Sequence, residues 1–348
     1  MKQNFNINNI TRETIKSLEP YSSARDEYTA SSQEMVFLDA NENPFSTNVN
    51  RYPDPQQNLV KQELSKINNI SVANILLGNG SDEVLDLIFR AFCEPNQDNV
   101  ITLPPTYGMY SVLANINAIQ NNKIALTKEF QPAVNQVLET ANTKSKILFL
   151  CSPNNPTGNS FNTSEVETLL NNFPGLVVID EAYIDFSENI SWMQRLAEFP
   201  NLIITQTLSK AYGMAGIRLG VCYASAEIIA ILNKIKPPYN VNALTQQKAL
   251  SRLQNMEAVT SEINNIKEQR SLLISALKDV SYISKIYPSD ANFLLLKVDD
   301  ANQRYQQLID KNIVIRNRSN QVLCEDCLRI TVGTAQENQT LIQALKSL

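Results

Sequence analysis

The stretch "KILFLCSPNNPTG" (146–158) joins a run of five apolar residues to a loop with two prolines, two asparagines and a glycine. An apolar run without polar alternation is typical of a strand covered on both faces, as in a parallel sheet between two layers of helices. In open sheets of this kind, ligands bind beyond the carboxyl ends of the strands. The amides of Asn154 and Asn155 are therefore candidates for ligand contacts, although the same residues also make a well-formed turn.

Similar apolar runs lie on both sides of this stretch, and segments with helical spacing separate them. In 81–93, for instance, one face of the expected helix is apolar and carries Val84, Leu85, Ile88, Ala91 and Phe92. Strands that alternate with helices predict an α/β fold with a mostly parallel sheet. The predicted strands are "NILL" (74–77), "VITL" (100–103), "KILFLC" (146–151), "LVVID" (176–180), "NLIITQ" (201–206) and "LGVCYA" (219–224).

The prolines of "KPPYN" (236–240) interrupt this alternation. A long helical pattern follows to about residue 279, and strands near 293–298, 313–316 and 328–332 and a closing helix predict a smaller α+β domain. A chain of 348 residues has room for about two domains. We therefore predict an N-terminal arm with part of the small domain (1–50, with a short strand at 35–40), a large ligand-binding domain (51–240) and a small C-terminal domain (241–348).

The composition excludes several classes of protein. With 35 acidic and 30 basic residues the net charge is −5, so there is no basic field for nucleic acid. No apolar run approaches the ~20 residues of a membrane span. The polar start "MKQNFNINNI" is unlike a signal peptide, so we expect a cytoplasmic protein. Five scattered cysteines argue against a disulfide framework, and we interpret the single CxxC at 324–327 as two ordinary thiols rather than as a zinc site.

The chain has no histidine. This excludes Ser-His-Asp and Cys-His catalysis, histidine general bases and histidine-ligated metals. Any acid–base chemistry must therefore use lysine, tyrosine, aspartate, glutamate, cysteine or a cofactor. A binding protein without catalysis is also compatible with this composition.

The stretch "LLGNGSDE" (76–83) predicts a strand, a tight turn and the start of a helix. The backbone amides of Gly80, Ser81 and Asp82 would then form an anion site at the helix N-terminus. An ordinary helix start capped by Ser81 is the alternative. The spacing matches neither of the glycine motifs that bind nucleotides.

Two further stretches combine charge with buried surroundings. In "VVIDEAYIDF" (177–186), Asp180 ends an apolar strand, where a carboxylate is costly unless it meets a cation such as a protonated ring nitrogen or a structural arginine. In "TLSKAYGMAGIRLG" (207–220), Lys210 lies among two hydroxyls and Arg218. That combination suits a phosphate-bearing ligand beside a reactive amine.

The motifs of this chain, in their order, resemble those of the fold-type-I pyridoxal-phosphate-dependent aminotransferases. The similarity covers nearly the whole chain from "PYSSAR" (20–25) onward. It implies a large domain with a mostly parallel seven-stranded sheet between helices, a smaller α+β domain, pyridoxal 5'-phosphate as cofactor and a homodimer with shared active sites. The motifs are "NENP" (41–44), "RYPDP" (51–55), "GNGSDE" (78–83), "PPTYGMY" (104–110), "SPNNPTG" (152–158), "DEAYIDF" (180–186), "TLSKAYGMAGIRLG" (207–220) and "LRITVG" (328–333).

The resemblance also implies a role for each candidate residue. Lys210 would bind the cofactor covalently and move the proton of the reaction. Asp180 would keep the pyridine nitrogen protonated, Tyr183 and Asn155 would bind the phenolic oxygen, and Tyr107 would stack on the ring. The remaining cofactor contacts would be Gly80, Ser81, Asp82, Thr207, Ser209, Arg218 and, from the second subunit, Tyr52.

Within this family the motifs are most similar to those of enzymes that act on histidinol phosphate. The resemblance implies ping-pong transamination with 2-oxoglutarate, giving imidazole-acetol phosphate and glutamate in histidine biosynthesis. Arg329 would bind the phosphate of one substrate and the carboxylate of the other, while Arg316 and Tyr21 resemble the added phosphate contacts. Asn155 is expected to contact the substrate as well. A solvated charge at a strand end is the alternative for Arg316.

Other activities are compatible with the same motifs. A related decarboxylase of threonine phosphate would use the same cofactor and would need no 2-oxoglutarate. Transamination of aromatic amino acids is a further enzymatic alternative. A cofactor-binding regulator would need a DNA-binding module, and neither a helix-turn-helix extension nor a basic face is evident.

Overall fold

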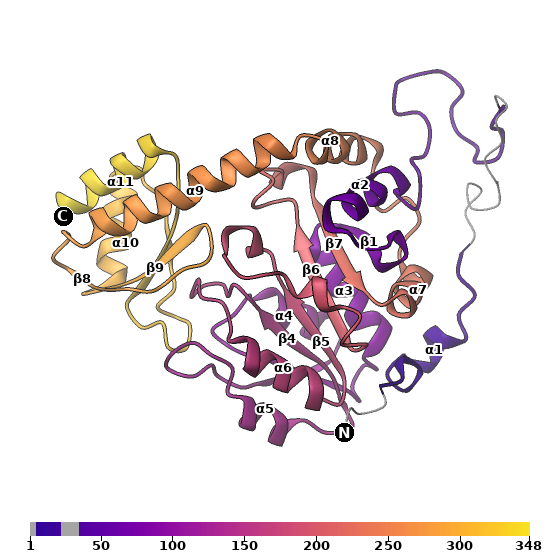
Figure 1. The fold of residues 1–348 in the computed structure, drawn as a ribbon, viewed down its shortest axis with the longest axis horizontal. Coiled ribbons are helices and arrows are strands. Elements are labelled where there is room, and N and C mark those ends of the chain that lie inside the picture. The colour runs from indigo at the N-terminus through magenta and orange to yellow at the C-terminus, as the bar shows by residue number, and fades with distance from the viewer. Residues whose placement is uncertain (1–4, 22–34) are drawn as a thin grey trace.

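A computed structural model describes residues 5–21 and 35–348 of the protein. Its centre is a seven-stranded sheet with the strand order β1-β7-β6-β5-β4-β2-β3 (Figure 1). The α/β class with a mostly parallel seven-stranded sheet is thus confirmed. The strands are β1 (Ile75–Asn79), β2 (Asn99–Thr102), β3 (Gln120–Lys123), β4 (Ser145–Cys151), β5 (Leu176–Asp180), β6 (Leu202–Thr207) and β7 (Leu219–Ala224).

The pairing of strands within this sheet places three loops next to one another at the carboxyl ends of the strands. Strands β3, β2, β4, β5 and β6 run parallel, whereas β7 is antiparallel to both β6 and β1. Cys151 pairs with Asp180, and Asp180 pairs with Thr205, so β4, β5 and β6 end at nearly the same level. The loops that follow these strands therefore lie together at their carboxyl ends.

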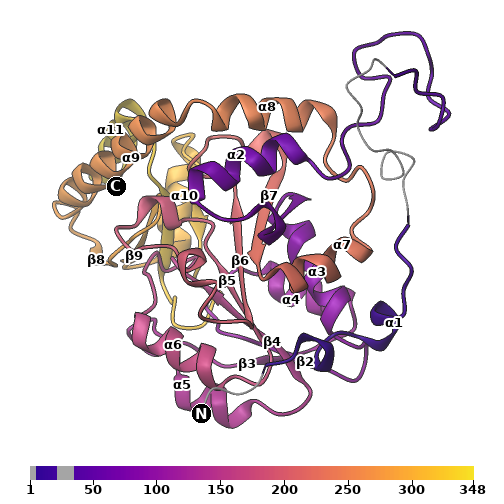
Figure 2. The same cartoon turned by 45° about the vertical axis from the view of Figure 1, so that its right-hand side comes forward.

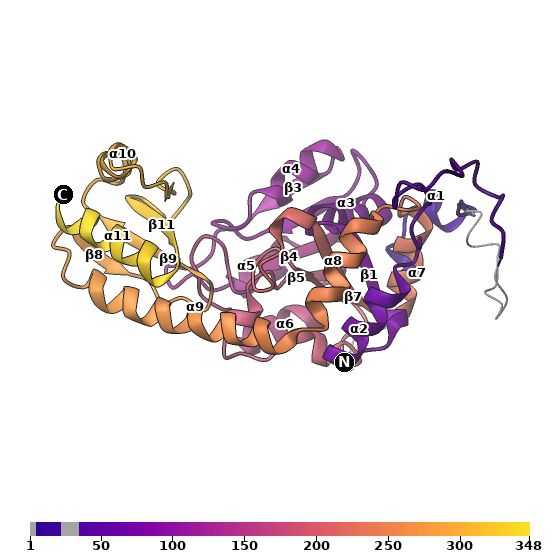
Figure 3. The same ribbon diagram turned by 90° about the horizontal axis from the view of Figure 1, so that it is seen from above.

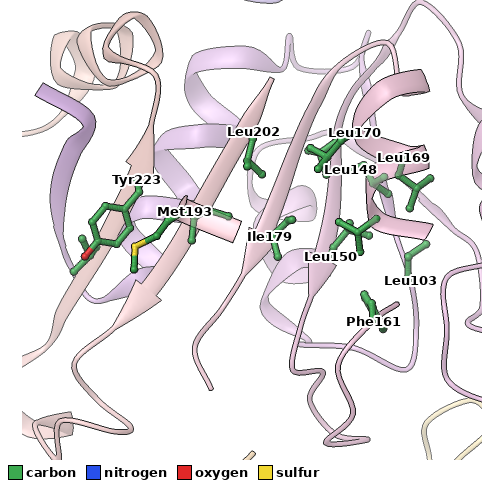
Figure 4. Packing of buried hydrophobic residues seen from close by; sticks show 14 of the residues in the cluster. Leu103, Leu148, Leu150, Phe161, Leu169, Leu170, Ile179, Met193, Leu202 and Tyr223 are labelled. Carbon is green, nitrogen blue, oxygen red and sulfur yellow. The ribbon is translucent and has the colours of Figure 1, made fainter. Parts of the chain in front are cut away.

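Helices cover both faces of the sheet (Figure 2). The strands alternate between the two faces: Leu148 and Leu150 point to one apolar cluster, and Ile147 and Phe149 point to the other. Figure 4 shows the first cluster, in which Leu169 and Leu170 of α6 pack over Leu148 and Leu150. Helices α2 (Asn58–Asn68), α5 (Val134–Thr140), α6 (Thr163–Asn172) and α8 (Ala243–Leu253) cover this face, and α3 (Ser81–Phe92), α4 (Met109–Ile116) and α7 (Ala226–Ile235) cover the other.

A second, antiparallel sheet with the order β10-β11-β9-β8 lies at one end of the molecule (Figure 3). The long helix α9 (Met256–Leu277) runs from the central layers to this sheet, as Figures 1 and 3 show. The other elements here are β8 (Ile283–Ile286), β9 (Phe293–Val298), α10 (Ala301–Asp310), β10 (Arg316–Asn317), β11 (Cys327–Thr331) and α11 (Ala335–Lys346). Short helices elsewhere are α1 (Glu13–Lys16) and the 3₁₀ helices Ile7–Asn9, Val72–Asn74, Ile184–Phe186, Trp192–Arg195 and Ala215–Ile217.

Most predicted elements are confirmed, and the differences have physical reasons. The strand predicted at 35–40 is wrong: Val36 and Leu38 are exposed, and the segment pairs with no strand among residues 5–21 and 35–348. The helical pattern after residue 240 is two helices, because Asn255 ends one run and caps α9 through its side chain. Strands β3 and β8 were not predicted. The domain boundaries at 50/51 and 240/241 stay predictions.

Apolar side chains are exposed along the N-terminal arm, which leaves the body of the molecule at the end opposite the small sheet (Figure 1). Val36, Leu38, Phe45 and Val49 are all more than half exposed. Within the described residues, no helix is long and apolar enough to cross a membrane.

Candidate active site

A cavity of about 580 Å³ opens at the carboxyl ends of β4 and β5. Residues from the large sheet and from β10 and β11 line it together. They are Ser81, Thr106, Tyr107, Gly108, Met109, Val112, Cys151, Asn155, Asp180, Ala182, Tyr183, Lys210, Arg316, Arg318, Gln321 and Arg329.

Asp180 is the buried acid of this cavity and is only 3% exposed. The hydroxyl of Tyr110 donates to its Oδ2 at 2.8 Å, and the amide of Ala182 donates to its Oδ1 at 3.2 Å. Burial raises the pKa of Asp180 to about 6, although the Tyr110 hydrogen bond opposes this rise. In the part of the chain that the structure describes, no cation contacts the carboxylate of Asp180 directly, although the charge of Lys210 in the same cavity interacts with it.

Lys210 follows β6 and lines the same cavity, from which its side chain is accessible. Its Nζ lies 5.9 Å from the centre of the Tyr183 ring. Partial burial lowers the pKa of Lys210, and the positive charges of Arg329 and Arg218 lower it further. A larger fraction of this amine is therefore neutral near pH 7 than in a surface lysine, which favours action as a base or nucleophile.

A short hydrogen-bonded chain joins the two sheets across the cavity. Arg329 on β11 donates from Nη1 to Oδ1 of Asn155 at 2.5 Å. The amide nitrogen of Asn155 donates to the hydroxyl of Tyr183 at 3.3 Å. Burial lowers the pKa of Arg329, and its Nε has no acceptor although it is buried. One side of this guanidinium is thus available to an anion.

The start of α3 has the features of an anion site. Gly80 precedes the helix with φ +80°, and no side chain caps the helix N-terminus. An added Cβ at Gly80 would lie 2.7 Å from Nη2 of Arg218, so only glycine leaves room for this guanidinium. The hydroxyl of Thr207 donates to that of Ser209 at 3.0 Å nearby. The alternative in which Ser81 caps α3 is wrong, because Ser81 is the first helical residue and Gly80 occupies the N-cap position.

Close packing fixes this helix start against the sheet. Gly220 on β7 pairs with Thr207 on one side and with Gly78 on the other. A Cβ at Gly220 would come within 2.2 Å of the backbone nitrogen of Ser81. The absence of a side chain at this position therefore lets α3 begin directly beside the end of β6.

Arg316 and Arg329 face each other in the small sheet. They are directly paired between β10 and β11, and both line the cavity. Tyr107 also lines it, and its hydroxyl donates to Oδ1 of Asp82 at 3.0 Å.

Seven predicted residues are absent from the lining of this cavity. Five of them belong to the anion site at the start of α3 and the end of β6, namely Gly80, Asp82, Thr207, Ser209 and Arg218, and the other two are Tyr52 and Tyr21. Tyr52 is half exposed and stacks on Tyr239 at 4.4 Å between ring centres, in the N-terminal arm region. Tyr21 is 74% exposed and does not line the cavity. The second-subunit role predicted for Tyr52 cannot be satisfied within one chain, and the roles of both residues stay predictions.

Three polar residues of the site were missed in the sequence. Tyr110 contacts Asp180 from α4, and Arg318 and Gln321 line the cavity from the segment after β10. For Arg318 a signal was present, because it lies two residues after Arg316 and alternate residues of a strand share a face. No sequence signal connected Tyr110 to Asp180, which follows 70 residues later.

Comparison with known proteins agrees with this geometry. Residues 28–345 match the family model described as aminotransferase class I and II. The histidinol-phosphate aminotransferase of Flavobacterium johnsoniae is 65% identical over 345 residues, which are 99% of each chain.

Solved structures share the fold at lower identity. The histidinol-phosphate aminotransferase from Clostridium acetobutylicum has a TM-score of 0.80 and 22% identity, covering 86% of this chain and 91% of that chain. The enzyme of the same name from Sinorhizobium meliloti, solved in complex with pyridoxal-5'-phosphate, has a TM-score of 0.79 and 23% identity, covering 86% and 83%. The chain belongs to the class I and II aminotransferase family.

Proposed function

We propose that this protein transfers the amino group of histidinol phosphate to 2-oxoglutarate, giving imidazole-acetol phosphate and glutamate. The observation that carries this proposal is a single cavity in which Lys210, Asp180 and Arg329 meet. The closely related histidinol-phosphate aminotransferase supports the choice of substrate. The reaction would belong to histidine biosynthesis and take place in the cytoplasm.

The residues of the site fit pyridoxal phosphate. The uncapped start of α3 and the Gly80–Arg218 contact offer amides and a guanidinium to a phosphate group. The buried carboxylate of Asp180 has no cation in direct contact within the described chain, and a protonated pyridine nitrogen is a cation of suitable size. The phosphate would be bound by Gly80, Ser81, Thr207, Ser209 and Arg218, and the ring by Tyr107, Asn155, Asp180 and Tyr183, with Asp82 placing Tyr107.

When bound, the cofactor supplies an electron sink for the negative charge that develops on the substrate carbon bearing the amine. Lys210 would move the proton between that carbon and the aldehyde carbon of the cofactor, and partial burial lowers the pKa of its amine, which favours its action as a base. Asp180 holds a proton on the ring nitrogen. The side-chain amide of Asn155 donates to the hydroxyl of Tyr183, and the two side chains would orient the reacting groups.

Arg329 accounts for the order in which the substrates bind. Its guanidinium, whose Nε–H lacks an acceptor among the described residues, would donate either to the phosphate of histidinol phosphate or to a carboxylate of glutamate. Since both substrates use the same guanidinium, the first product must leave before the second substrate binds, which is a ping-pong sequence. Arg316 and Tyr21 would provide further phosphate contacts.

We also propose a homodimer in which Tyr52 reaches the phosphate of the neighbouring active site. The exposure of Tyr52 and the apolar arm around it supports a second copy as the partner.

The absorption spectrum of the cofactor-loaded enzyme tests this function. Histidinol phosphate alone should change the cofactor band, and 2-oxoglutarate should restore it. Lys210→Ala should lose at least about 100-fold in turnover with an unchanged circular dichroism spectrum. The control Lys311→Ala removes an exposed lysine of the small domain and should keep full activity.

Two outcomes would contradict the proposed substrate. Release of CO₂ from threonine phosphate without any need for 2-oxoglutarate would identify a decarboxylase. Response to aromatic amino acids but not to histidinol phosphate would identify an aromatic aminotransferase. An active Lys210→Ala enzyme would overturn the mechanism itself.

A further inference from the structure

Three arginines share one face of the β10–β11 pair. Arg316 is directly opposite Arg329. Arg318 follows Arg316 by two residues, and its backbone nitrogen continues the ladder by donating to the carbonyl of Cys327 at 2.8 Å. Residues two apart on a strand point to the same side, and all three side chains line the active-site cavity.

No carboxylate balances these three charges. In the described part of the chain, none of the three arginines forms an ion pair, and the hydrogen bond of Arg329 goes to the neutral amide of Asn155. The Nε atoms of Arg318 and Arg329 are buried without an acceptor. Burial, with the charges of Arg329 and Arg316, lowers the pKa of Arg318 to about 10. Like charges placed opposite each other on neighbouring strands destabilise a sheet, and a bound anion would offset this repulsion.

The Arg318 side chain is not needed to hold its own segment. The backbone nitrogen of Arg318 bonds to Cys327, and its carbonyl accepts from the nitrogen of Gln321 at 2.9 Å. These backbone bonds fix the turn, while the side chain lines the cavity and its buried Nε has no acceptor. A purely structural arginine would instead have its donors paired within the fold.

We infer that Arg318 is a further specificity-determining residue, which binds the phosphate group of the substrate and makes the site favour phosphate over carboxylate. This inference rests on the proposed function. One guanidinium fork satisfies both oxygens of a carboxylate. A phosphate monoester has three terminal oxygens and nearly two negative charges, so it uses donors and charge beyond those of Arg329. Loss of Arg318 should therefore weaken binding of histidinol phosphate and spare 2-oxoglutarate.

The first test compares kcat/KM for the two substrates, which report separate half-reactions in a ping-pong enzyme. For Arg318→Gln, kcat/KM for histidinol phosphate should fall about 10- to 100-fold, the usual effect of losing a hydrogen bond to a charged group. The value for 2-oxoglutarate should stay within about threefold. Arg318→Lys keeps the charge and should recover part of the loss. Arg90→Gln removes an exposed arginine of α3 outside the cavity and should change neither value.

A second measurement needs no turnover. Inorganic phosphate, titrated calorimetrically into the cofactor-loaded enzyme, should bind the wild type and bind Arg318→Gln at least about tenfold more weakly. In phosphate-free buffer the variant should melt at the same temperature as the wild type or higher, because one of three repelling charges is gone.

Equal loss for both substrates, no loss for either, or a lower melting temperature of Arg318→Gln would each overturn the inference. If the wild type does not turn over histidinol phosphate, the proposed function fails. The phosphate titration then still decides whether Arg318 belongs to an anion site.

Discussion

At the scale of single residues, Asp180 shows how a group needed for function costs stability. The carboxyl group is buried, and its pKa is raised to about 6 from an ordinary value of 3.8. Folding of the cofactor-free protein is therefore opposed by ionisation of this group. The free energy of unfolding is therefore highest below the pKa that Asp180 has in the unfolded chain, and it decreases as the pH rises through about 6.

Asp180→Asn should therefore stabilise the cofactor-free protein at pH 8 by about 1 to 3 kcal/mol relative to the wild type. The amide keeps the shape of the carboxyl group and cannot ionise. Urea unfolding at pH 5 and pH 8 measures the effect, and the difference between variant and wild type should grow towards pH 8. A difference that is the same at both pH values would show that the carboxylate is not destabilising.

Activity should move in the opposite direction. Asp180→Asn cannot hold a proton on the ring nitrogen, so turnover should fall at least about 100-fold. Burial also raises the pKa of the neighbouring Glu181 to about 7, but Glu181 is present in both proteins and cancels in the comparison.

Residue types and spacing identified the chemistry of the site but not all of its members. Asp180, Lys210, Asn155 and Arg329 were expected near one another, and one cavity contains all four. Tyr110 could not be found in this way, because its contact depends on how α4 packs beneath the sheet. The place of Arg318 in the cavity depends on the pairing of β10 with β11, which the alternation of side chains alone does not reveal.

At the scale of elements, the junction of β7 with the start of α3 is the most constrained part of the site. Gly220→Ala would place a methyl group 2.2 Å from the Ser81 nitrogen and 2.4 Å from the carbonyl carbon of Gly80. Backbone atoms on both sides must then shift. We expect a loss of about 1 to 3 kcal/mol in the free energy of unfolding, and weaker cofactor binding.

Gly216→Ala is the matched control, because no atom lies within 4 Å of the added methyl group. Its stability should stay within about 0.5 kcal/mol of the wild type. Urea unfolding and titration with pyridoxal phosphate compare the two variants. Equal behaviour of both alanine variants would contradict the packing argument.

The elements predicted correctly were those whose apolar composition indicates that they are buried. Strands rich in valine, isoleucine and leucine are central in the sheet, and their apolar runs made them visible. Strand β3 has the sequence "QNNK" and lies at the edge of the sheet. Only its hydrogen bonds to β2 make it a strand, and its polar residues gave no sign of burial. Conversely, "MVFLDA" has the composition of a strand but meets no partner in the described chain.

At the scale of the whole molecule, the proposed sharing of active sites through Tyr52 can be tested by mixing two inactive variants. If the active sites are shared, Lys210→Ala and Tyr52→Ala should complement each other after mixing and refolding. A mixed dimer holds one site with both native residues, so random pairing should restore about a quarter of the wild-type activity. Each variant alone should stay impaired, and additive activity without recovery would indicate independent sites.

Helix α9 connects the layers around the large sheet to the small sheet. Its 22 residues extend about 33 Å from the break at Gln254–Asn255 to the sheet that carries Arg329. A helix of this length that stays straight would convert a tilt of about 5° at its first turn into a displacement of about 3 Å at its far end, the length of a hydrogen bond. A small change in packing near the break would thus alter the distance between the guanidinium groups and an anion by the length of a hydrogen bond.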